Sequence, residues 1–286
     1  MSLSPVSSVP EIRQRLNQLR AGKKSIGLVP TMGALHAGHA SLIARARTEC
    51  DCVIVSIFVN PLQFGPNEDY QRYPRPLAKD LAVCEAQGAD LVFAPDVSDM
   101  YASPQLTYVD VTRIADHLCG AFRPGHFRGV STVVLKLFNI VQPDRAYFGE
   151  KDYQQLCVIR RMVSDLNVPL AVVSVPTFRE ADGLALSSRN VYLEPAQRAA
   201  APGLFRALGA AREMIEAGET DAMKVKAAAT KGLAADAHVR IEYFEIVDPA
   251  EVQPVTSITG PVRIAAAIWI GKTRLIDNVA ARSASE

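Results

Sequence analysis

The stretch that most constrains this chain runs from Pro30 to His39, where an apolar segment meets the start of a helix. Residues 25–29 predict a strand, and the spacing of apolar residues after Gly38 predicts a helix. A strand, a glycine-bearing turn and a helix N-terminus together present backbone N–H groups and a positive dipole end to an anion. Glycines such as Gly33 let the backbone approach a phosphate closely. The stretch therefore predicts a turn that binds phosphate or a nucleotide.

His36 and His39 lie in this stretch, three residues apart, so they project to the same side of the helix start. Two imidazoles there can donate hydrogen bonds to phosphate oxygens as negative charge develops. Zinc binding is one alternative, but it needs a third ligand, and the sequence has no His-Glu-x-x-His pattern. Ordinary capping or surface histidines are another. The pattern His-x-Gly-His resembles the signature of adenylate-forming and nucleotidyl-transferring enzymes.

The composition is that of a globular protein with one large or two modest domains. The 286 residues are 49% hydrophobic and 21% charged, with a formal net charge of +1. This balance argues against broad nucleic-acid or membrane-surface binding. The five cysteines form no Cys-x-x-Cys pair, and their odd number suggests reduced thiols. The sequence shows neither a secretory leader nor an apolar run of transmembrane length, so we expect a soluble, cytoplasmic protein.

Strand and helix patterns alternate through the first part of the chain. We expect a first helix at 9–20, strands at 25–29, 52–59, 89–94, 145–148 and 170–175, and intervening helices after 38, at 77–87, through 133–140 and at 153–166. Such units predict an α/β fold, a Rossmann-like doubly wound parallel sheet that binds ligands at the carboxyl ends of its strands. A smaller C-terminal α+β domain is expected from helices at about 195–217 and 221–235 and strands near 239–247 and 262–270. The predicted domains are residues 1–176 and 177–286.

Two loops of the first domain contain residues suited to a small polar ligand. Asn60 and Gln63 follow the strand at 52–59, where they can hydrogen-bond a substrate, although a simple turn is the alternative. Arg123 and Arg128 lie among three glycines and suggest an anion clamp, because guanidinium groups match carboxylate and phosphate geometry. Charges on a surface loop are the alternative for both arginines.

Two further segments contain residue types suited to phosphate. Lys151 and Asp152 follow a strand that ends at Gly149, and Gln155 lies on the first turns of the next helix. Lys151 is a compact positive charge suited to phosphates, whereas Asp152 is either an N-cap or a ligand to a nucleotide hydroxyl or a metal. The Ser-Ser-Arg run at residues 187–189 can donate hydrogen bonds to a phosphoryl group, and a plain linker is the alternative.

Five ordered blocks, spread over nearly the whole chain, closely resemble the pantoate–β-alanine ligase family. They are PTMGALHAGH at 30–39, FVNPLQF at 58–64, RPGHFRGVSTVV at 123–134, AYFGEKDYQQ at 146–155 and READGLALSSRN at 179–190. The resemblance implies a homodimeric ligase with a Rossmann-like N-terminal domain and a C-terminal lid. It implies ATP-dependent condensation of (R)-pantoate with β-alanine, which yields pantothenate, AMP and pyrophosphate through a pantoyl adenylate. This reaction belongs to pantothenate and coenzyme A biosynthesis.

The resemblance also implies roles for individual residues. His39 would be the proton donor, and residues 186–189 would form a KMSKS-like loop that closes over the triphosphate. The implied catalytic residues are His36, His39, Lys151, Ser187, Ser188 and Arg189. The implied ATP site comprises Met32, Gly33, Ala34, Leu35, His36, Ala37, Gly38, His39, Gly149, Glu150, Lys151, Asp152, Phe178, Leu186, Ser187, Ser188 and Arg189. The substrate-binding candidates are Gln63, Gln155, Asn60 and Arg123, of which Gln63 and Gln155 would hold pantoate.

Magnesium is implied by the ATP chemistry. Asp80 is a candidate contributor, but its neighbours depart from the acidic run of some relatives, so no metal ligand is assigned. The expected partners are pantoate, β-alanine and ATP, with neither nucleic acid nor membrane.

Two other functions fit parts of the pattern. A nucleotidyltransferase of the HxGH group would keep the nucleotide on its product, whereas the ligase releases free AMP. A nucleotide-binding module without catalysis would not need both histidines, Lys151 and the Ser-Ser-Arg run. An aminoacyl-tRNA synthetase is disfavoured because the chain is short, nearly neutral and lacks an evident tRNA-binding extension.

Overall fold

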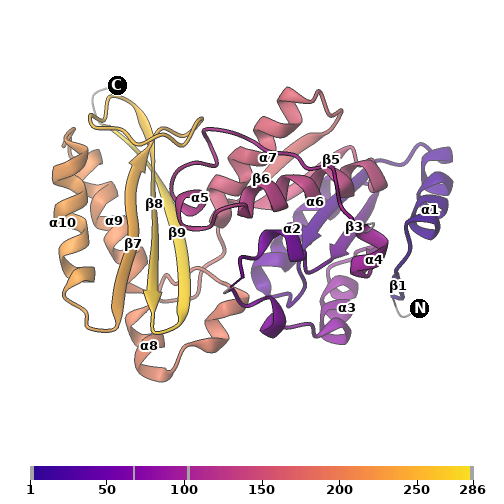
Figure 1. The fold of residues 1–286 in the computed structure, drawn as a ribbon, viewed down its shortest axis with the longest axis horizontal. Helices are drawn as coiled ribbons and strands as arrows, with labels where there is room; N and C mark the ends of the chain where they lie inside the picture. Colours follow the sequence, from indigo (N-terminus) through magenta and orange to yellow (C-terminus); the bar gives the residue numbers. More distant parts are fainter. Residues whose placement is uncertain (1–2, 67, 102–103, 284–286) are drawn as a thin grey trace. The chain divides into compact units, whose positions relative to one another are not determined.

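The computed structural model describes residues 3–66, 68–101 and 104–283, and contacts divide the chain into two compact units (Figure 1). The first unit comprises Met1–Val111, Arg123–Glu150 and Val158–Pro176. The second comprises Thr112–Phe122, Lys151–Cys157 and Thr177–Glu286. A single domain boundary between residues 176 and 177 stays a prediction, since two short earlier segments group with the second unit.

The first unit is built on a parallel six-stranded sheet. Its strands, in spatial order, are β1 (Pro5–Val6), β4 (Leu91–Phe93), β3 (Cys52–Ile57), β2 (Ile26–Thr31), β5 (Arg145–Gly149) and β6 (Ala171–Val175). From β2 the chain adds β3 and β4 on one side and later β5 and β6 on the other, so the winding reverses between β2 and β5. This order confirms the predicted doubly wound α/β sheet. Ligands of such sheets bind where the winding reverses, at the carboxyl ends of the strands.

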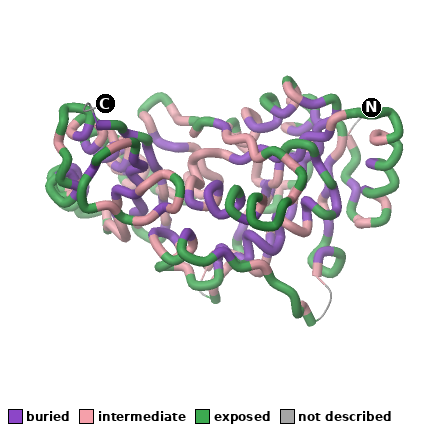
Figure 2. The backbone as a smooth tube through the Cα atoms, turned by 90° about the horizontal axis from the view of Figure 1, so that it is seen from above, coloured by how far each residue is buried: buried purple, intermediate pink, exposed green. Residues whose placement is uncertain are grey.

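Helices and short 3₁₀ turns connect these strands. They are α1 (Val9–Ala21), α2 (Ala37–Glu49), η1 (Pro61–Gln63), η2 (Tyr70–Arg72), α3 (Leu77–Ala86), α4 (Val97–Met100), α6 (His126–Val141), η3 (Glu150–Asp152) and α7 (Tyr153–Asp165). The helix α2 packs against α3, and α1 packs against α6. Right-handed crossovers put α2 and α3, whose connections run one way across the sheet, on one face, and α1, α6 and α7, whose connections run the other way, on the opposite face. Figure 2 shows exposed residues on the outer helices and buried residues inside each unit.

The second unit contains an antiparallel three-stranded sheet in the order β7-β8-β9. Its elements are α5 (Cys119–Phe122), η4 (Ser188–Tyr192), α8 (Pro195–Ala200), α9 (Gly203–Glu216), α10 (Ala222–Ala234), β7 (Val239–Val247), β8 (Pro261–Ile270) and β9 (Thr273–Arg282). The helix α9 packs against β8 and β9, and α10 packs against β7. Apolar side chains such as Leu208, Ile215, Phe244 and Ile264 form the core between helices and sheet. The predicted small α+β domain is confirmed.

Two strands were not expected from the sequence. β1 has only two residues, which is too short for any periodic signal. In β9 the buried polar pair Asp277 and Asn278 interrupts the apolar pattern. Within residues 3–66, 68–101 and 104–283, no helix combines the length and apolar character needed to cross a bilayer.

Candidate active site

The turn after β2 lies at the point where the winding of the parallel sheet reverses. Gly33 and Ala34 adopt left-handed backbone conformations, with φ of 78° and 51°. Two successive left-handed residues turn the chain sharply, so that the backbone N–H groups of Ala34 and Leu35 face α3. Asp80, from α3, accepts both: its Oδ2 lies 3.0 Å from Ala34 N and its Oδ1 lies 2.7 Å from Leu35 N. The sequence predicted that N–H groups of this turn bind a phosphate. Two of them instead bind a carboxylate of the chain itself.

Asp80 is therefore an anchor for the turn. The residue is 1% exposed, and burial raises the pKa of its carboxyl although the two N–H bonds act in the opposite direction. Both oxygens of this carboxylate already bind backbone groups, and no magnesium ligand is assigned to it. Among the described residues, no three His, Cys, Asp or Glu side chains gather as a group that could hold a metal ion.

Asp80→Asn is expected to lower the free energy of unfolding by about 1–3 kcal/mol, because one amide oxygen replaces two acceptors and a buried N–H loses its partner. The raised pKa in the folded state means that the folded protein binds this proton more tightly than the unfolded chain. The proton-linked part of the stability is therefore fully present below the ordinary pKa of about 3.9 and is lost as pH rises through the folded value, whereas the two N–H bonds to Asp80 persist. Urea unfolding of both proteins from pH 4 to 7 should show the advantage of the native protein growing as pH falls. A difference that is independent of pH would contradict this account.

His36 and His39 cap the N-terminus of α2 in a reciprocal way. His36 is the N-cap residue, and its Nδ1 accepts from Gly38 N at 3.1 Å. His39 is the third helical residue, and its Nδ1 accepts from His36 N at 3.3 Å. Because both Nδ1 atoms accept backbone N–H groups, the proton of each neutral ring lies on Nε2. The ring centroids lie 4.1 Å apart, so the two imidazoles stand together at the start of α2. Imidazole N–H groups at a helix N-terminus are suited to phosphate oxygens.

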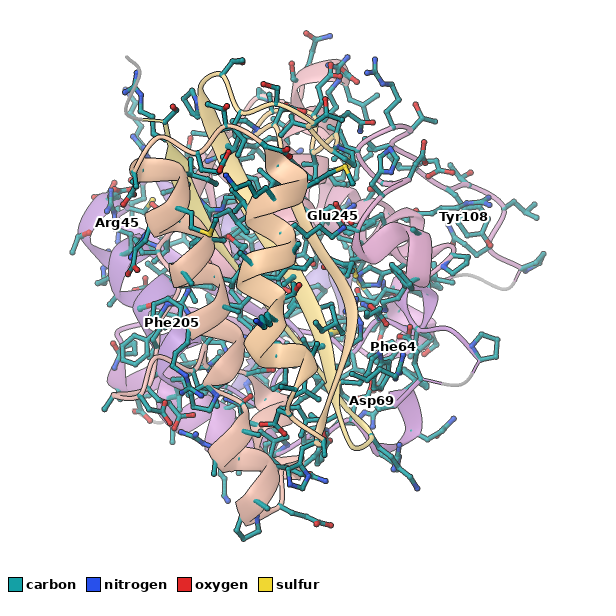
Figure 3. All side chains as sticks on the ribbon, turned by 90° about the vertical axis from the view of Figure 1, so that its left-hand side faces the viewer. Arg45, Phe64, Asp69, Tyr108, Phe205 and Glu245 are labelled. Carbon is teal, nitrogen blue, oxygen red and sulfur yellow. The ribbon has the colours of Figure 1, made fainter. Side chains whose placement is uncertain are left out.

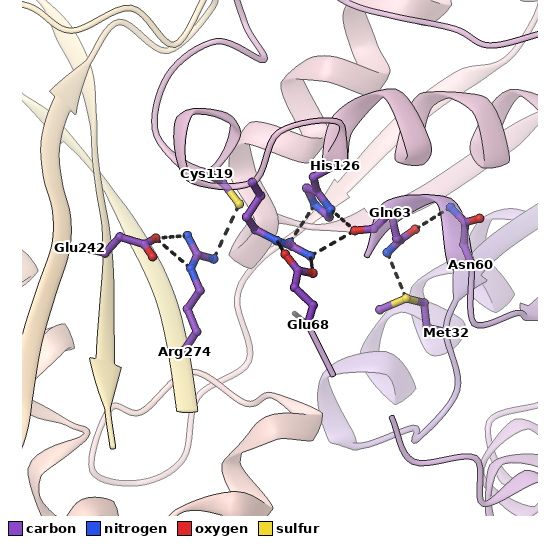
Figure 4. Close-up of polar contacts among 9 residues, drawn as sticks. Met32, Asn60, Gln63, Glu68, Cys119, His126, Glu242 and Arg274 are labelled. Atoms are coloured by element: carbon purple, nitrogen blue, oxygen red, sulfur yellow. Dashed lines mark hydrogen bonds and ion pairs between the residues drawn. The ribbon is translucent and has the colours of Figure 1, made fainter. Parts of the chain in front are cut away.

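Gln63 and Asn60 occupy the loop after β3. Gln63 is 8% exposed and Asn60 is 1% exposed. Gln63 Nε2 lies 3.0 Å from Met32 Sδ, and Gln63 Oε1 accepts from Asn60 Nδ2 at 3.1 Å (Figure 4). Two of the predicted substrate-binding residues are therefore in contact with each other, and one of them reaches the turn after β2.

Arg123 interacts mainly with groups of the protein itself. Its Nε donates to Glu68 Oε1 at 2.7 Å, and its Nη2 donates to Glu68 Oε2 and, at 3.2 Å, to Gln63 O. His126 Nδ1 lies 2.8 Å from the same carbonyl of Gln63. Glu68 neutralises the guanidinium, so these contacts favour a role in positioning the Gln63 backbone over the predicted anion clamp. Arg128, the second predicted clamp residue, lies with its guanidinium 4.1 Å from the ring centroid of Tyr108.

Gly149 ends β5, the strand beside β2 across the reversal of winding, and Glu150 follows it in η3. Among the described residues, a side chain added at Gly149 would meet nothing within 4 Å. The backbone at this strand end is therefore open to a close approach by a ligand.

The remaining predicted residues belong to the second unit. Lys151 has its Nζ 3.8 Å from Asp152 Oδ2, and its carbonyl accepts from Asn278 Nδ2 of β9 at 2.9 Å. Gln155 is half-buried on the first turn of α7. Its neighbour Gln154 is instead a structural residue, because it bonds backbone groups of Ile114, His117 and Cys119.

The Ser-Ser-Arg run is part of a braced loop, which argues against a plain linker. Arg179 forms a bidentate ion pair with Asp277, a residue of β9 whose side chain is 2% exposed. The Arg179 guanidinium also lies 4.0 Å from the ring centroid of Phe205. Figure 3 labels Phe205 on the helix α9. Ser187 Oγ accepts from Arg189 N at 3.2 Å and caps η4.

Two adjacent residues of β9 therefore hold two predicted phosphate-binding segments. Asp277 fixes the base of the loop that leads to residues 186–189, and Asn278 fixes the backbone of Lys151. Phe178 is 46% exposed, and its carbonyl accepts from Leu186 N at 3.0 Å. No local sequence pattern points to Asp277 and Asn278, because their partners lie about a hundred residues away.

Comparisons with known proteins agree with this arrangement. The sequence model of the family described as Pantoate-beta-alanine ligase matches residues 4–280. The pantothenate synthetase of Moorella thermoacetica is 55% identical over 274 residues, which cover 96% of this chain and 97% of that protein. The crystal structure of pantothenate synthetase from Thermus thermophilus is similar with a TM-score of 0.92 and 50% identity, covering 97% of this chain and 99% of that one.

A third relative was solved with ligands. It is the pantoate-beta-alanine ligase of Francisella tularensis, complexed with beta-gamma ATP and β-alanine, with a TM-score of 0.79 and 36% identity. The match covers 97% of each chain. The family model thus matches nearly the whole sequence, and several relatives are more than 50% identical to this chain. This chain belongs to the pantoate–β-alanine ligase family.

Proposed function

We propose that this chain is an AMP-forming ligase that condenses pantoate with β-alanine at the expense of ATP. Membership of the family supports this reaction, as does the relative solved with an ATP ligand and β-alanine. The observation that carries the proposal is the reciprocal cap of His36 and His39, which places two imidazoles at the start of α2, directly after the turn that follows β2. Gln63, next to Met32, supplies a polar contact for an acid substrate beside them.

Two steps account for the chemistry. In the first, the pantoate carboxylate attacks the α-phosphorus of ATP, the bond to the β-phosphate oxygen breaks, and pyrophosphate leaves. His36 and His39 donate hydrogen bonds to the phosphate oxygens, with His39 as proton donor, while Lys151 and residues 187–189 balance the charge of the triphosphate. In the second, the β-alanine amine attacks the acyl carbon of pantoyl adenylate, AMP leaves, and the amine loses a proton. Gln63 and Gln155 hold pantoate through both steps.

Magnesium enters, on this proposal, as the complex of ATP. Magnesium prefers phosphate oxygens, a few carboxylates and water over a closed protein cage. This preference is compatible with a chain in which Asp80 is committed to backbone groups. The family resemblance supports a homodimer in the cytoplasm, and a lid role for the second unit.

The test is AMP release from purified protein with ATP and magnesium, with pantoate and β-alanine added singly and together. We expect AMP and an equal amount of pyrophosphate only when both are present. A nucleotidyltransferase would instead keep the nucleotide on its product and release pyrophosphate without AMP. A protein that binds ATP but forms no AMP with both substrates would overturn the ligase assignment.

A further inference from the structure

The orientation of the Asn60 side chain is fixed by backbone groups. Asn60 Oδ1 accepts from Leu62 N at 3.3 Å, and Asn60 Nδ2 donates to Gly129 O at 3.1 Å. A backbone N–H can only donate and a carbonyl can only accept, so the oxygen and nitrogen of this amide cannot be exchanged.

This orientation also determines which group of Gln63 faces the substrate. Asn60 Nδ2 donates to Gln63 Oε1, so the oxygen of the Gln63 amide is already occupied. The Nε2 group therefore turns to Met32 Sδ, 3.0 Å away, which is only a weak acceptor (Figure 4). Gln63 thus offers an N–H donor, which matches a carboxylate or hydroxyl oxygen of an acid substrate.

Tyr101 supplies the shortest hydrogen bond of Asn60. Its hydroxyl donates to Asn60 Oδ1 at 2.7 Å, against 3.3 Å for the bond from Leu62 N. The ring lies with its centroid 6.0 Å from that of Phe58 and 5.2 Å from the Lys136 ammonium, so the phenol is held by its surroundings. Burial raises the pKa of Tyr101, which keeps the hydroxyl protonated and able to donate.

We propose that Tyr101 is a positioning residue for pantoate, which acts through Asn60 to hold Gln63 with its Nε2 donor facing an oxygen of that substrate. The inference rests on the proposed function, because it takes Gln63 as a pantoate contact. Tyr101 itself touches neither substrate nor ATP in this scheme. Loss of the Tyr101 hydroxyl should therefore affect the binding of pantoate only, and only while the Gln63 amide is present.

The test is a double-mutant cycle with Tyr101→Phe and Gln63→Ala, read as KM and kcat for pantoate and KM for ATP. Tyr101→Phe should raise the KM for pantoate about three- to tenfold, the range of one net hydrogen bond, with kcat and the KM for ATP nearly unchanged. In the Gln63→Ala background, the same substitution should change the KM for pantoate less than about twofold, because the group it positions is gone. Tyr108→Phe is the matched control, since that hydroxyl donates to Gln105 O at 2.9 Å.

The possible results distinguish a failure of this inference from a failure of the proposed function. If the native protein forms no AMP, the ligase assignment fails and the inference falls with it. If the native protein is active and Tyr101→Phe leaves the KM for pantoate unchanged, the positioning role is wrong. It is also wrong if the effect persists in the Gln63→Ala background, or if kcat and the KM for ATP change equally, since those results describe general damage to the fold.

Discussion

His39→Ala is expected to slow pantoyl adenylate formation by about 100- to 1,000-fold, the usual cost of removing one donor to a developing negative charge. The Nδ1 atom of His39 accepts His36 N, so its Nε2–H is oriented before ATP arrives. An oriented donor strengthens most in the transition state, where charge builds on the α-phosphate, and contributes less to the ground state. We therefore expect ATP affinity to fall by less than about tenfold. Single-turnover formation of AMP and equilibrium titration with ATP measure the two effects separately.

His39 also caps α2, and a second variant separates this role from catalysis. Glutamine at the third helical position can accept the N-cap N–H through its side-chain oxygen. His39→Gln should therefore recover most of the stability lost in His39→Ala, about 1 kcal/mol or less, while its adenylation rate stays low. If His39→Gln restored the rate together with the stability, His39 would be a capping residue only. Unchanged turnover in His39→Ala would remove it from the mechanism altogether.

The parallel sheet was predictable because its strands are buried on both faces. Residues 52–57 are apolar except for Ser56, and five of these six residues are buried in β3. The helix at 153–166 and the strand at 239–247 were predicted to within a residue of α7 and β7. β9 was missed because its apolar alternation stops at Asp277 and Asn278, whose partners Arg179 and Lys151 come from distant segments.

The candidate site was also predictable only in part. The His-x-Gly-His pattern predicted two histidines on one side of a helix start, because three residues in a helix return to that side. It did not predict that Asp80 would fill the turn, nor that Tyr101 would reach Asn60. Both contacts join segments more than forty residues apart. Long-range hydrogen bonds of this kind leave no periodic trace in one sequence, and a folded backbone is needed to find them.

Gly129→Ala is expected to be the most damaging substitution outside the histidine pair. Gly129 lies in α6, and an added Cβ would stand 2.2 Å from Leu62 O and 2.7 Å from Gln63 N. No side chain rotation can relieve a contact with backbone, so α6 and η1 must separate. We expect a loss of about 3 kcal/mol in the free energy of unfolding. The kcat/KM for pantoate should fall about 10- to 100-fold, because the displaced backbone carries Gln63.

A matched control comes from the second unit, where the same substitution meets no obstacle. Gly232 is exposed within α10, and an added Cβ there meets nothing among the described residues within 4 Å. Gly232→Ala should stabilise the protein by about 0.5–1 kcal/mol, because alanine favours the helix and narrows the unfolded ensemble. Denaturant unfolding and pantoate kinetics of both variants make the comparison. Both variants replace a helical glycine by alanine, so helix propensity changes their stability alike. The difference between their free energies of unfolding therefore reports the contact of the added Cβ with Leu62 and Gln63. If Gly129→Ala kept native stability and native kcat/KM, the close packing of α6 against the Gln63 loop would be contradicted.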